Sequence, residues 1–583
     1  MIRENALGKK NSCHYVGLRY ISRFLLPIVS VCCIQAWAEE IELVSAPGET
    51  KEVTESGTYT ASQDLTFGAL EVKAQNVTFD FSEDEARKVV FNGSSATALL
   101  VNKKRANVTF KRGEWSVAEG FNSLFLCSNK DAYETKVFLD SCVWTNLNSV
   151  YVGRNASSCT LTLDNHSRIY SKEFRLVNGG DGRCALNILG GSGLFLSSTD
   201  TPFRTDTRDG DGGNGTITVA GDGSILSAPN SEFRFGYYAA DQFLVVSNKA
   251  SLVANKFIIG VNSAATGSQV LVADSATLTA KDISIRNPGC VMTVSNATLA
   301  VDSTAVDAIK VGYAGRTGGS FVLSGKDAQI NYNPSGNVDV FAADSGGAEF
   351  RIENGATWEV DATQIASKTS NSVFRVGYGG TFRARDNNRL QFGPAGDDNA
   401  DPAYSLSNRL EVCDGGKLEF ASIRFSGAGN MLIVSNGLIT CGSIQIGYNR
   451  PYWINTSKVT SRDCALVLRG ESGQIDAQNG ALQIQNGSVL RFEVPEDGYE
   501  SDIIPLKVKS LSFADGTNME IDCEAFMYKG GKVTLVEVTE EFKDIDNMIA
   551  SVNASLPQGC YLSVIGKKLM LTCSKRRFVF SIR

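Results

Sequence analysis

A strand-turn-strand unit recurs along most of this chain, and it limits the possible folds more than any other feature. Each unit has an alternating apolar strand, a turn containing Asn, Asp or Gly, and a second short strand. Successive units lie 22 to 31 residues apart, which is too short for a βαβ unit and fits one coil of a β-solenoid. Clear copies begin at Leu161, Ile217, Leu244, Val270, Met292, Phe350, Leu410 and Leu432.

The alternation within a unit predicts which side chains point inward. In the first of these copies, Leu161 and Leu163 point to one side and Thr162 to the other. One coil cannot bury its own inner face, but the next coil can cover it when stacked about 4.8 Å away. We therefore predict an all-β fold, a right-handed parallel β-helix over residues 39–497, with its first coils and N-terminal cap at 39–115. A series of β-sandwich domains is the alternative.

A second element, apolar-any-apolar-Gly, follows most units, and we expect its Gly to end a strand at a corner of the coil. A tyrosine comes directly after this Gly in several units. Packing against neighbouring corners is the simpler interpretation of these rings. The alternative, if the coils stack in register, is an exposed ladder suited to stacking on sugars. The tyrosines are Tyr237, Tyr313, Tyr378 and Tyr448.

The repeat pattern ends before the C-terminal part of the chain. Residues 498–583 contain several short strand patterns and one amphipathic segment at 541–553, with Phe542, Ile545 and Met548 on one helical face. We predict a small β-rich capping module with one short helix. Such a cap covers the open edge that the last coil otherwise presents.

The N-terminal 38 residues have the pattern of a signal peptide. A basic segment precedes an apolar run at 24–34, and Ala36-Trp-Ala38 follows with the small-any-small pattern of a cleavage site. The run is shorter than the roughly 20 residues that a bilayer-spanning helix needs. We predict cleavage after Ala38 and secretion to the bacterial cell surface, and no later segment predicts a transmembrane helix.

Composition narrows the classes of partner. The net charge is −7, and the acidic chain lacks the clusters of Lys and Arg that nucleic acid requires. The three consecutive basic residues at 575–577 are expected to be a solvated tail. Eleven of the 14 cysteines follow the signal segment without any Cys-x-x-Cys pair, so we interpret them mainly as small apolar residues inside the repeats. Their disulfide pairing stays open.

The units Met292-Thr-Val-Ser-Asn and Leu432-Ile-Val-Ser-Asn, with the ending at 556–572, carry a family resemblance. Over most of residues 150–575 the chain resembles the autotransporter-associated β-strand repeat proteins, which are large secreted bacterial proteins with passenger-type right-handed β-helices. The resemblance implies an adhesin-like or structural role at the cell surface. It implies no catalytic residues.

Catalytic motifs are absent from the sequence. His166 is the single histidine after the signal segment, and it lies in the turn Asp164-Asn-His-Ser, where we expect a solvated residue. There is no nucleophile elbow, zinc-protease helix or phosphate-binding loop. We therefore predict a protein that is not an enzyme, and we assign no catalytic, cofactor-binding or metal-binding residues.

Carboxylates in two polar loops, 205–215 and 393–402, keep a catalytic alternative open, because sugar hydrolysis needs two acids roughly 5–9 Å apart. Turn formation and solubility are the simpler interpretation of both loops. Asp209-Gly-Asp-Gly-Gly-Asn also weakly resembles a Ca²⁺ loop, although it lacks the closing Glu of an EF-hand. The candidate acids are Asp206, Asp209, Asp211, Asp397, Asp398 and Asp401.

These observations predict a secreted, non-catalytic, surface-displayed β-helix protein that is adhesin-like or structural. Its expected partners are extracellular polysaccharide or the surface of a host or neighbouring cell. The alternatives are a polysaccharide-active β-helix enzyme, either a lyase or a glycoside hydrolase, and a carbohydrate-binding module.

Overall fold

A computed structural model describes most of the chain from residue 40 to residue 575. The predicted signal peptide lies outside the described residues. So do these internal segments: 82–86, 94–96, 119–122, 127–131, 155–157, 179–182, 200–202, 206–213, 335–337, 343, 362, 366–367, 386–387, 395–404, 449–460 and 501.

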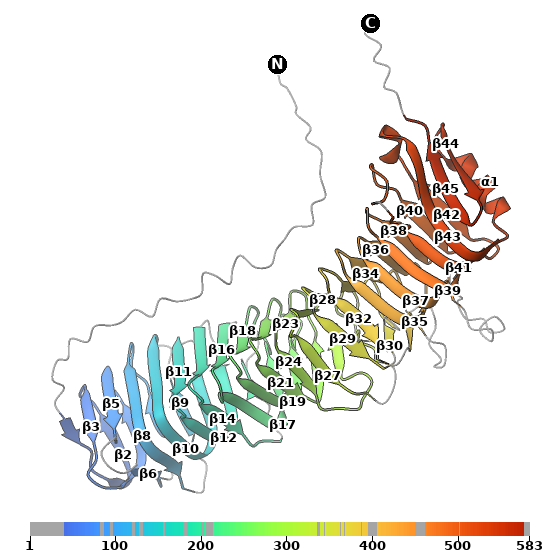
Figure 1. The fold of residues 1–583 in the computed structure, drawn as a ribbon. Helices are drawn as coiled ribbons and strands as arrows, with labels where there is room; N and C mark the ends of the chain where they lie inside the picture. Colours follow the sequence, from blue (N-terminus) through green and yellow to red (C-terminus); the bar gives the residue numbers. More distant parts are fainter. Residues whose placement is uncertain are drawn as a thin grey trace, which may run out of the picture.

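Successive turns of the chain stack as parallel strands into a long, solenoid-like rod (Figure 1). Each coil contributes three short strands or strand halves, so the rod has three faces. On the first face, for example, Leu161 pairs in register with Val137 of the previous coil and Leu186 of the next. This parallel stacking confirms the predicted all-β solenoid architecture and excludes separate β-sandwiches over these residues.

The first face is one column of parallel strands from the N-terminal to the C-terminal end of the rod. It consists of β1 (Glu40–Glu42), β3 (Gly57–Thr60), β5 (Asn76–Asp80), the first half of β8 (Asn107–Val117), the first part of β10 (Thr135–Arg154), β11 (Cys159–Asp164), β13 (Arg183–Ile188), β16 (Asn214–Ala220), β18 (Phe243–Ser247), β20 (Gln269–Ala273), β23 (Val291–Ser295), β26 (Ser320–Ser324), β28 (Glu349–Glu353), β31 (Val373–Val376), β34 (Arg409–Cys413), β36 (Met431–Ser435), β38 (Ala465–Arg469), β40 (Val489–Glu493) and β42 (Asn518–Asp522).

The other two faces share several long strands that bend at a corner and contribute one half to each face. These are β2 (Ala46–Val53), β4 (Leu65–Val72), β12 (Arg168–Asn178), β17 (Ile225–Phe235), β19 (Ser251–Ile259), β35 (Lys417–Phe425), β37 (Leu438–Ile446), β39 (Gln474–Ile484), β41 (Leu506–Phe513) and β43 (Gly531–Lys543). The second face also has β6 (Lys88–Phe91), β14 (Gly193–Leu196), β21 (Thr277–Ala280), β24 (Thr298–Val301), β27 (Gln329–Tyr332), β29 (Thr357–Val360) and β32 (Thr381–Ala384). The third face also has β7 (Thr97–Val101), β9 (Ser123–Leu126), β15 (Phe203–Arg204), β22 (Asp282–Ile285), β25 (Ile309–Val311), β30 (Thr363–Ile365) and β33 (Arg389–Phe392).

The corner between the first and second faces is made by the predicted Asn and Asp residues. Asn165, Asn248, Asp274 and Asn436 have φ between 50° and 57°, the left-handed region that short amide and carboxylate side chains tolerate. The corner Gly of the second predicted element also has positive φ, as at Gly236 with 65°. Both sequence signals therefore mark the places where a coil turns.

The core is a set of in-register stacks of inward-pointing side chains. Phe174, Phe203, Phe233 and Phe257 lie above one another along the third face, with ring centroids 5.3, 4.1 and 5.1 Å apart, and each is at most 1% exposed. Each ring covers the one below it from water, so no coil is buried until its neighbour is in place. The rod is held together by this shared burial and by the parallel ladder.

The second face is interrupted in the middle of the rod. β27 pairs with β24 on one side, and β29 pairs with β32, but no ladder joins β27 to β29. The first face continues without a break through β26, β28 and β31. The rod changes direction over this region (Figure 1), as expected where one face loses its ladder and another keeps it.

Parallel coils extend into the predicted capping module, and its helix is shorter than predicted. Parallel pairing continues beyond residue 498, because β42 pairs with β40, and β43 pairs with β41. The helix α1 (Asp546–Ser555) begins five residues later than predicted. Its predicted first turn instead belongs to β43, where Glu541, Phe542 and Lys543 pair with residues of β41. The apolar residues that suggested one helix over 541–553 therefore lie partly in β43 and partly in α1.

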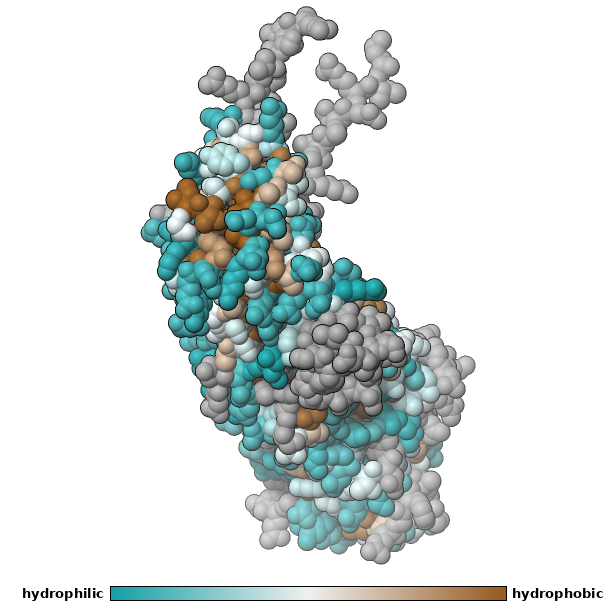
Figure 2. Space-filling model, turned by 90° about the vertical axis from the view of Figure 1, so that its right-hand side faces the viewer, coloured by the Kyte–Doolittle hydropathy of each residue, from teal (hydrophilic) through white to brown (hydrophobic). Residues whose placement is uncertain are grey.

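The end of the rod is covered by an antiparallel hairpin. It is made by β44 (Cys560–Ile565) and β45 (Lys568–Cys573), and β45 also pairs antiparallel with β43. Figure 2 faces this end of the rod and shows apolar side chains gathered on its upper part, above a mainly hydrophilic surface. Tyr561, Val564 and Ile565 of β44 are between 39% and 56% exposed.

Most cysteines of the rod are buried in the coils, as predicted for small apolar residues. Cys464 precedes β38 and is fully buried, and burial raises the pKa of its thiol to about 12. The buried Cys142 and Cys441 thiols also have a pKa of about 12 for the same reason. A thiol with this pKa stays protonated at neutral pH and is a weak nucleophile.

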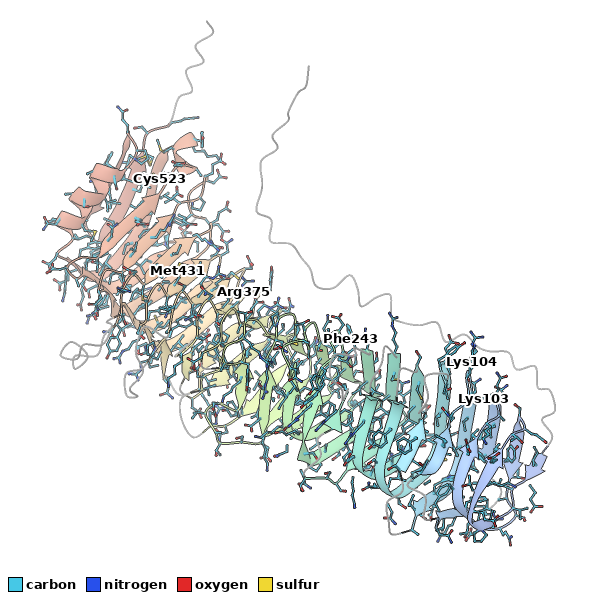
Figure 3. The ribbon with its side chains drawn as sticks, turned by 180° about the vertical axis from the view of Figure 1, so that it is seen from behind. Lys103, Lys104, Phe243, Arg375, Met431 and Cys523 are labelled. Carbon is cyan, nitrogen blue, oxygen red and sulfur yellow. A yellow bond between two sulfur atoms is a disulfide. The ribbon has the colours of Figure 1, made fainter. Side chains whose placement is uncertain are left out.

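Replacing Phe233 by Ala should lower the free energy of unfolding by about 3–5 kcal/mol, because it opens a cavity between two stacked rings. Urea unfolding measures the change. Phe243→Ala is the matched control, since Phe243 projects outward at the start of β18 and is 46% exposed (Figure 3). We expect a change below about 1 kcal/mol there. Equal losses at the two positions would contradict the in-register core.

The free energy of unfolding should also fall at alkaline pH through Cys464. The stabilisation that the Cys464 thiol contributes is complete below about pH 8.5, where the thiol is protonated in both the folded and the unfolded protein. It is lost as the pH rises toward the folded pKa of about 12. Between pH 7 and pH 10 the wild type should lose about 2 kcal/mol more than Cys464→Ala. Urea unfolding of both proteins at the two pH values tests this, and parallel losses would be inconsistent with a protonated thiol in the fold.

Candidate functional site: an arginine and tyrosine ladder

Three arginines lie in register on consecutive coils of the third face. Arg175 of β12 pairs with Arg204 of β15, and Arg204 pairs with Arg234 of β17. Neighbouring parallel strands are about 4.8 Å apart, so the three side chains leave the rod at closely spaced points along its axis. The geometry stacks three like charges in one outward column.

Local sequence explains why these arginines point outward. Each follows a phenylalanine of the core stack, namely Phe174, Phe203 or Phe233. Side chains alternate along a strand, so burying the phenylalanine turns the next residue to the surface. The core stack therefore sets both the direction and the spacing of the arginine column.

Tyrosine rings flank the arginines. Tyr151 pairs in register with Arg175, whose guanidinium carbon lies 5.4 Å from the ring centroid. The guanidinium carbons of Arg204 and Arg234 lie 5.0 and 5.4 Å from the centroid of Tyr237. These distances are within the range of cation–π contacts.

A further tyrosine extends this surface toward the C-terminal end. The guanidinium carbons of Arg286 and Arg316 lie 4.5 and 5.0 Å from the centroid of Tyr313. Arg316 is anchored by hydrogen bonds that it donates to the Asn287 side-chain oxygen at 2.9 Å and to the Val261 carbonyl at 3.0 Å. We use the name arginine–tyrosine ladder for Tyr151, Arg175, Arg204, Arg234, Tyr237, Arg286, Tyr313 and Arg316.

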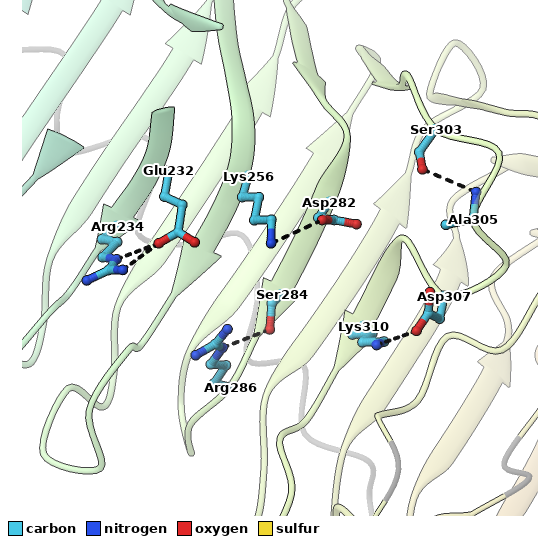
Figure 4. A network of polar contacts seen from close by, with 10 residues as sticks. All are labelled: Glu232, Arg234, Lys256, Asp282, Ser284, Arg286, Ser303, Ala305, Asp307 and Lys310. Atoms are coloured by element: carbon cyan, nitrogen blue, oxygen red, sulfur yellow. Dashed lines mark hydrogen bonds and ion pairs between the residues drawn. The ribbon is translucent and has the colours of Figure 1, made fainter. Parts of the chain in front are cut away.

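Carboxylates neutralise only part of this charge. Glu173 lies 3.0 Å from Arg175, and Glu232 lies 2.5 Å from Arg234 (Figure 4). Within the described part of the chain, Arg204 has no ion pair, and the Nε groups of Arg175 and Arg204 are buried without a hydrogen-bond partner. Among the described residues, the ladder thus holds more positive than negative charge on a protein that is acidic overall.

Two arginines of the ladder, Arg204 and Arg286, have a lowered pKa. Burial, with the neighbouring charges of Arg175 and Arg234, lowers the pKa of the Arg204 guanidinium below its ordinary value. Burial and the charge of Arg316 lower the pKa of Arg286 in the same way. Both groups remain charged near neutral pH. A bound anion at the surface would relieve this repulsion.

A second pair of arginines, Arg351 and Arg375, forms a balanced column, in which nearby carboxylates offset the positive charge. Arg351 and Arg375 also follow buried phenylalanines, but they lie on the first face. Arg375 lies 2.7 Å from Glu411 and 3.7 Å from Glu349. Burial alone would lower the pKa of Arg375, but the two carboxylates raise it above its ordinary value. This column (Arg375 is labelled in Figure 3) has internal partners and leaves little charge for a ligand.

The four tyrosines do not form one continuous ladder. Tyr378 follows β31 and so belongs to the first face, not to the corner that carries Tyr237. The coils of β19 and β22 separate Tyr237 from Tyr313. Tyr448 contacts Arg424, whose guanidinium carbon lies 4.5 Å from its ring centroid. Arginines lie against Tyr237, Tyr313 and Tyr448, and the Tyr238 ring also packs edge-on against Tyr237 with centroids 4.5 Å apart.

The other residues singled out in the sequence do not form a site in the described residues. His166 is an exposed turn residue with φ of 63°, as predicted. The six candidate acids and most of the possible Ca²⁺ loop lie outside the described residues, as do the arginines at 576–577. In the part that the structure describes, the one group of three potential metal ligands is made by Cys523, Cys560 and Cys573.

Comparisons with protein-family models, curated proteins and solved structures found no match. Among the described residues, no helix is long and apolar enough to cross a membrane. The arginine–tyrosine ladder is therefore interpreted from its own chemistry. Adjacent guanidinium groups bind carboxylates, sulfates or phosphates through paired hydrogen bonds, and tyrosine faces stack on sugar rings.

The dipeptide Phe-Arg at residues 174, 203 and 233 was the sequence signal for this site. Its spacing is close to one coil, so stacked coils place the three arginines together. The same dipeptide at 350 and 374 belongs to the balanced column, so the signal alone does not separate the two environments.

Inorganic sulfate should raise the melting temperature of the wild type at constant ionic strength, because a divalent anion relieves the repulsion between Arg175, Arg204 and Arg234. The rise should be smaller in Arg204→Gln. Differential scanning calorimetry in sulfate and in chloride measures both. Arg469→Gln, an exposed arginine on the first face, should respond as the wild type does. The same rise in all three proteins would show only a general salt effect.

Proposed function

We propose that this protein is a secreted, non-catalytic β-solenoid that binds acidic extracellular polysaccharide through its arginine–tyrosine ladder. The observation that carries this proposal is the in-register stack of Arg175, Arg204 and Arg234, in which two carboxylates among the described residues, Glu173 and Glu232, face three guanidinium groups. The role is adhesin-like or structural: a stiff rod displays a linear cationic and aromatic surface to a chain-like anion.

The linear form of the ladder favours a polymer over a small anion. Its first three arginines, Arg175, Arg204 and Arg234, repeat along the rod axis with the spacing of neighbouring strands, comparable to the length of one monosaccharide. A polysaccharide with a charge on each repeat can contact several guanidinium groups at once, and the flanking tyrosines can contact its sugar rings. Each further contact adds affinity without further loss of translational freedom.

Secretion and the right-handed coil belong to the same proposal. The pattern of residues 1–38 supports export, and right-handed connections between parallel strands are favoured in about 98% of cases. Membership of the autotransporter-associated β-strand repeat proteins stays a prediction from the sequence. A non-catalytic role is supported by the absence of the catalytic motifs sought in the sequence.

Binding should depend on the arginines of the ladder. With polygalacturonate as a carboxylated probe and heparin as a sulfated one, we expect Arg204→Gln combined with Arg234→Gln to weaken binding at least 10-fold, because removing each charge-assisted hydrogen bond costs about 1–2 kcal/mol. Isothermal titration calorimetry at two salt concentrations measures the affinity and its screening. The preferred probe distinguishes a uronate from a sulfate ligand.

Arg351→Gln combined with Arg469→Gln is the matched control, because it removes the same charge from the first face. It should bind as the wild type does. Equal weakening by both double variants, or equal binding of neutral dextran, would refute a specific acidic-sugar site. Stronger binding of single-stranded DNA than of either polysaccharide would assign the ladder to another polyanion. Release of reducing ends from either probe would refute the non-catalytic role.

A further inference from the structure

Three cysteines from distant parts of the sequence meet at the C-terminal end of the rod. Cys523 directly follows β42, the last strand of the first face, while Cys560 begins β44 and Cys573 ends β45. Their sulfur atoms all lie within 4.8 Å of one another. All three side chains are buried, with exposures of 1%, 9% and 3% (Cys523 is labelled in Figure 3).

The oxidation states of the three cysteines differ. Cys560 and Cys573 are joined by a disulfide across the β44–β45 hairpin, and Cys523 is a free thiol. A thiol held this close to a disulfide has the partner that exchange requires. A zinc site is less well supported, because it needs several thiolates together and two of these sulfurs are already bonded to each other.

We propose that Cys523, Cys560 and Cys573 form a thiol–disulfide exchange site that can join the last coil covalently to the cap, by which we mean the β44–β45 hairpin. Burial and the nearby Asp522 carboxylate raise the pKa of the Cys523 thiol, so only a small fraction of it is thiolate at neutral pH. That fraction, formed by loss of the thiol proton to water, attacks the sulfur of Cys560 or Cys573. A new sulfur–sulfur bond forms as the old one breaks, and the released cysteine leaves as a thiolate and takes up a proton. The exchange conserves electrons and needs no oxidant.

The exchange changes what the cross-link holds. The Cys560–Cys573 disulfide ties one strand of the hairpin to the other, 13 residues apart. A disulfide from Cys523 to either partner instead ties the hairpin to the end of β42. It closes a longer loop, which restricts the unfolded chain more. It also holds the cap over the open edge of the last coil, where another chain could otherwise pair.

Peptide mapping can read out each possible pairing, because trypsin separates the three cysteines. Cleavage after Lys509 and Lys529 releases Cys523, and the next cuts isolate the other two cysteines on peptides 544–567 and 569–575. The full chain is equilibrated in reduced and oxidised glutathione, quenched with acid, unfolded, alkylated with N-ethylmaleimide, digested without reduction and analysed by mass spectrometry.

In the wild type we expect disulfide-linked peptides that contain Cys523 alongside the Cys560–Cys573 pair. Cys560→Ser should yield a Cys523–Cys573 disulfide, and Cys573→Ser should yield a Cys523–Cys560 disulfide, each with loss of N-ethylmaleimide labelling at both cysteines. Oxidised glutathione supplies the oxidant in these two variants. Circular dichroism establishes that each variant is folded before mapping.

Two further variants serve as controls. Cys523→Ser should retain only the Cys560–Cys573 disulfide, and Cys464→Ser should show the same pairs as the wild type, because Cys464 lies in the corner of another coil. The proposal is overturned if the Cys523 peptide is always found alkylated and unlinked in the wild type. It is equally overturned if the two remaining cysteines stay unlinked in folded Cys560→Ser and Cys573→Ser.

Discussion

In-register stacking of inward side chains between successive coils is the interaction on which this fold depends. Phe203 is covered by Phe174 on one side and Phe233 on the other, and the same relation holds for Phe350 between Phe321 and Phe374. Parallel backbone ladders hold the strands at a spacing that brings these rings into contact. Neither the side-chain stack nor the backbone ladder is sufficient by itself, because a lone coil buries little apolar surface and has unpaired strand edges on both sides.

The same register has a consequence on the outside of the rod. A residue one position after a buried phenylalanine must emerge directly above and below its equivalents in the neighbouring coils. When those residues are Arg175, Arg204 and Arg234, the core holds three cations together against their mutual repulsion. The apolar stack inside provides the free energy that offsets this repulsion. A solenoid can therefore present a charged linear surface that an isolated strand or loop could not hold in place.

The ends and interruptions of a solenoid need other solutions, because an in-register stack has no natural end. At the C-terminal end the chain changes from parallel to antiparallel pairing, and β45 and β44 extend the second sheet beyond β43. In the middle, the missing ladder between β27 and β29 coincides with a change in the direction of the rod (Figure 1). In these two regions the spacing of the sequence units predicts the structure least well, because neither region continues the regular coil.

Sequence alone determined the class of fold, the inward positions and the corners. Period-two alternation, together with Asn or Asp at a constant place in each unit, is a local property of the chain, and the residues from Leu161 to Asn165 show both. Tertiary structure decided which outward residues become neighbours. Phe374-Arg375 and Phe203-Arg204 look alike in sequence, yet Arg375 lies beside Glu411, whereas Arg204 lies between Arg175 and Arg234. It also decided that Cys523 meets Cys560 and Cys573, and that residues 541–543 form a strand. Contacts between coils depend on how many residues each loop contains, and small differences in loop length shift which face a given motif occupies.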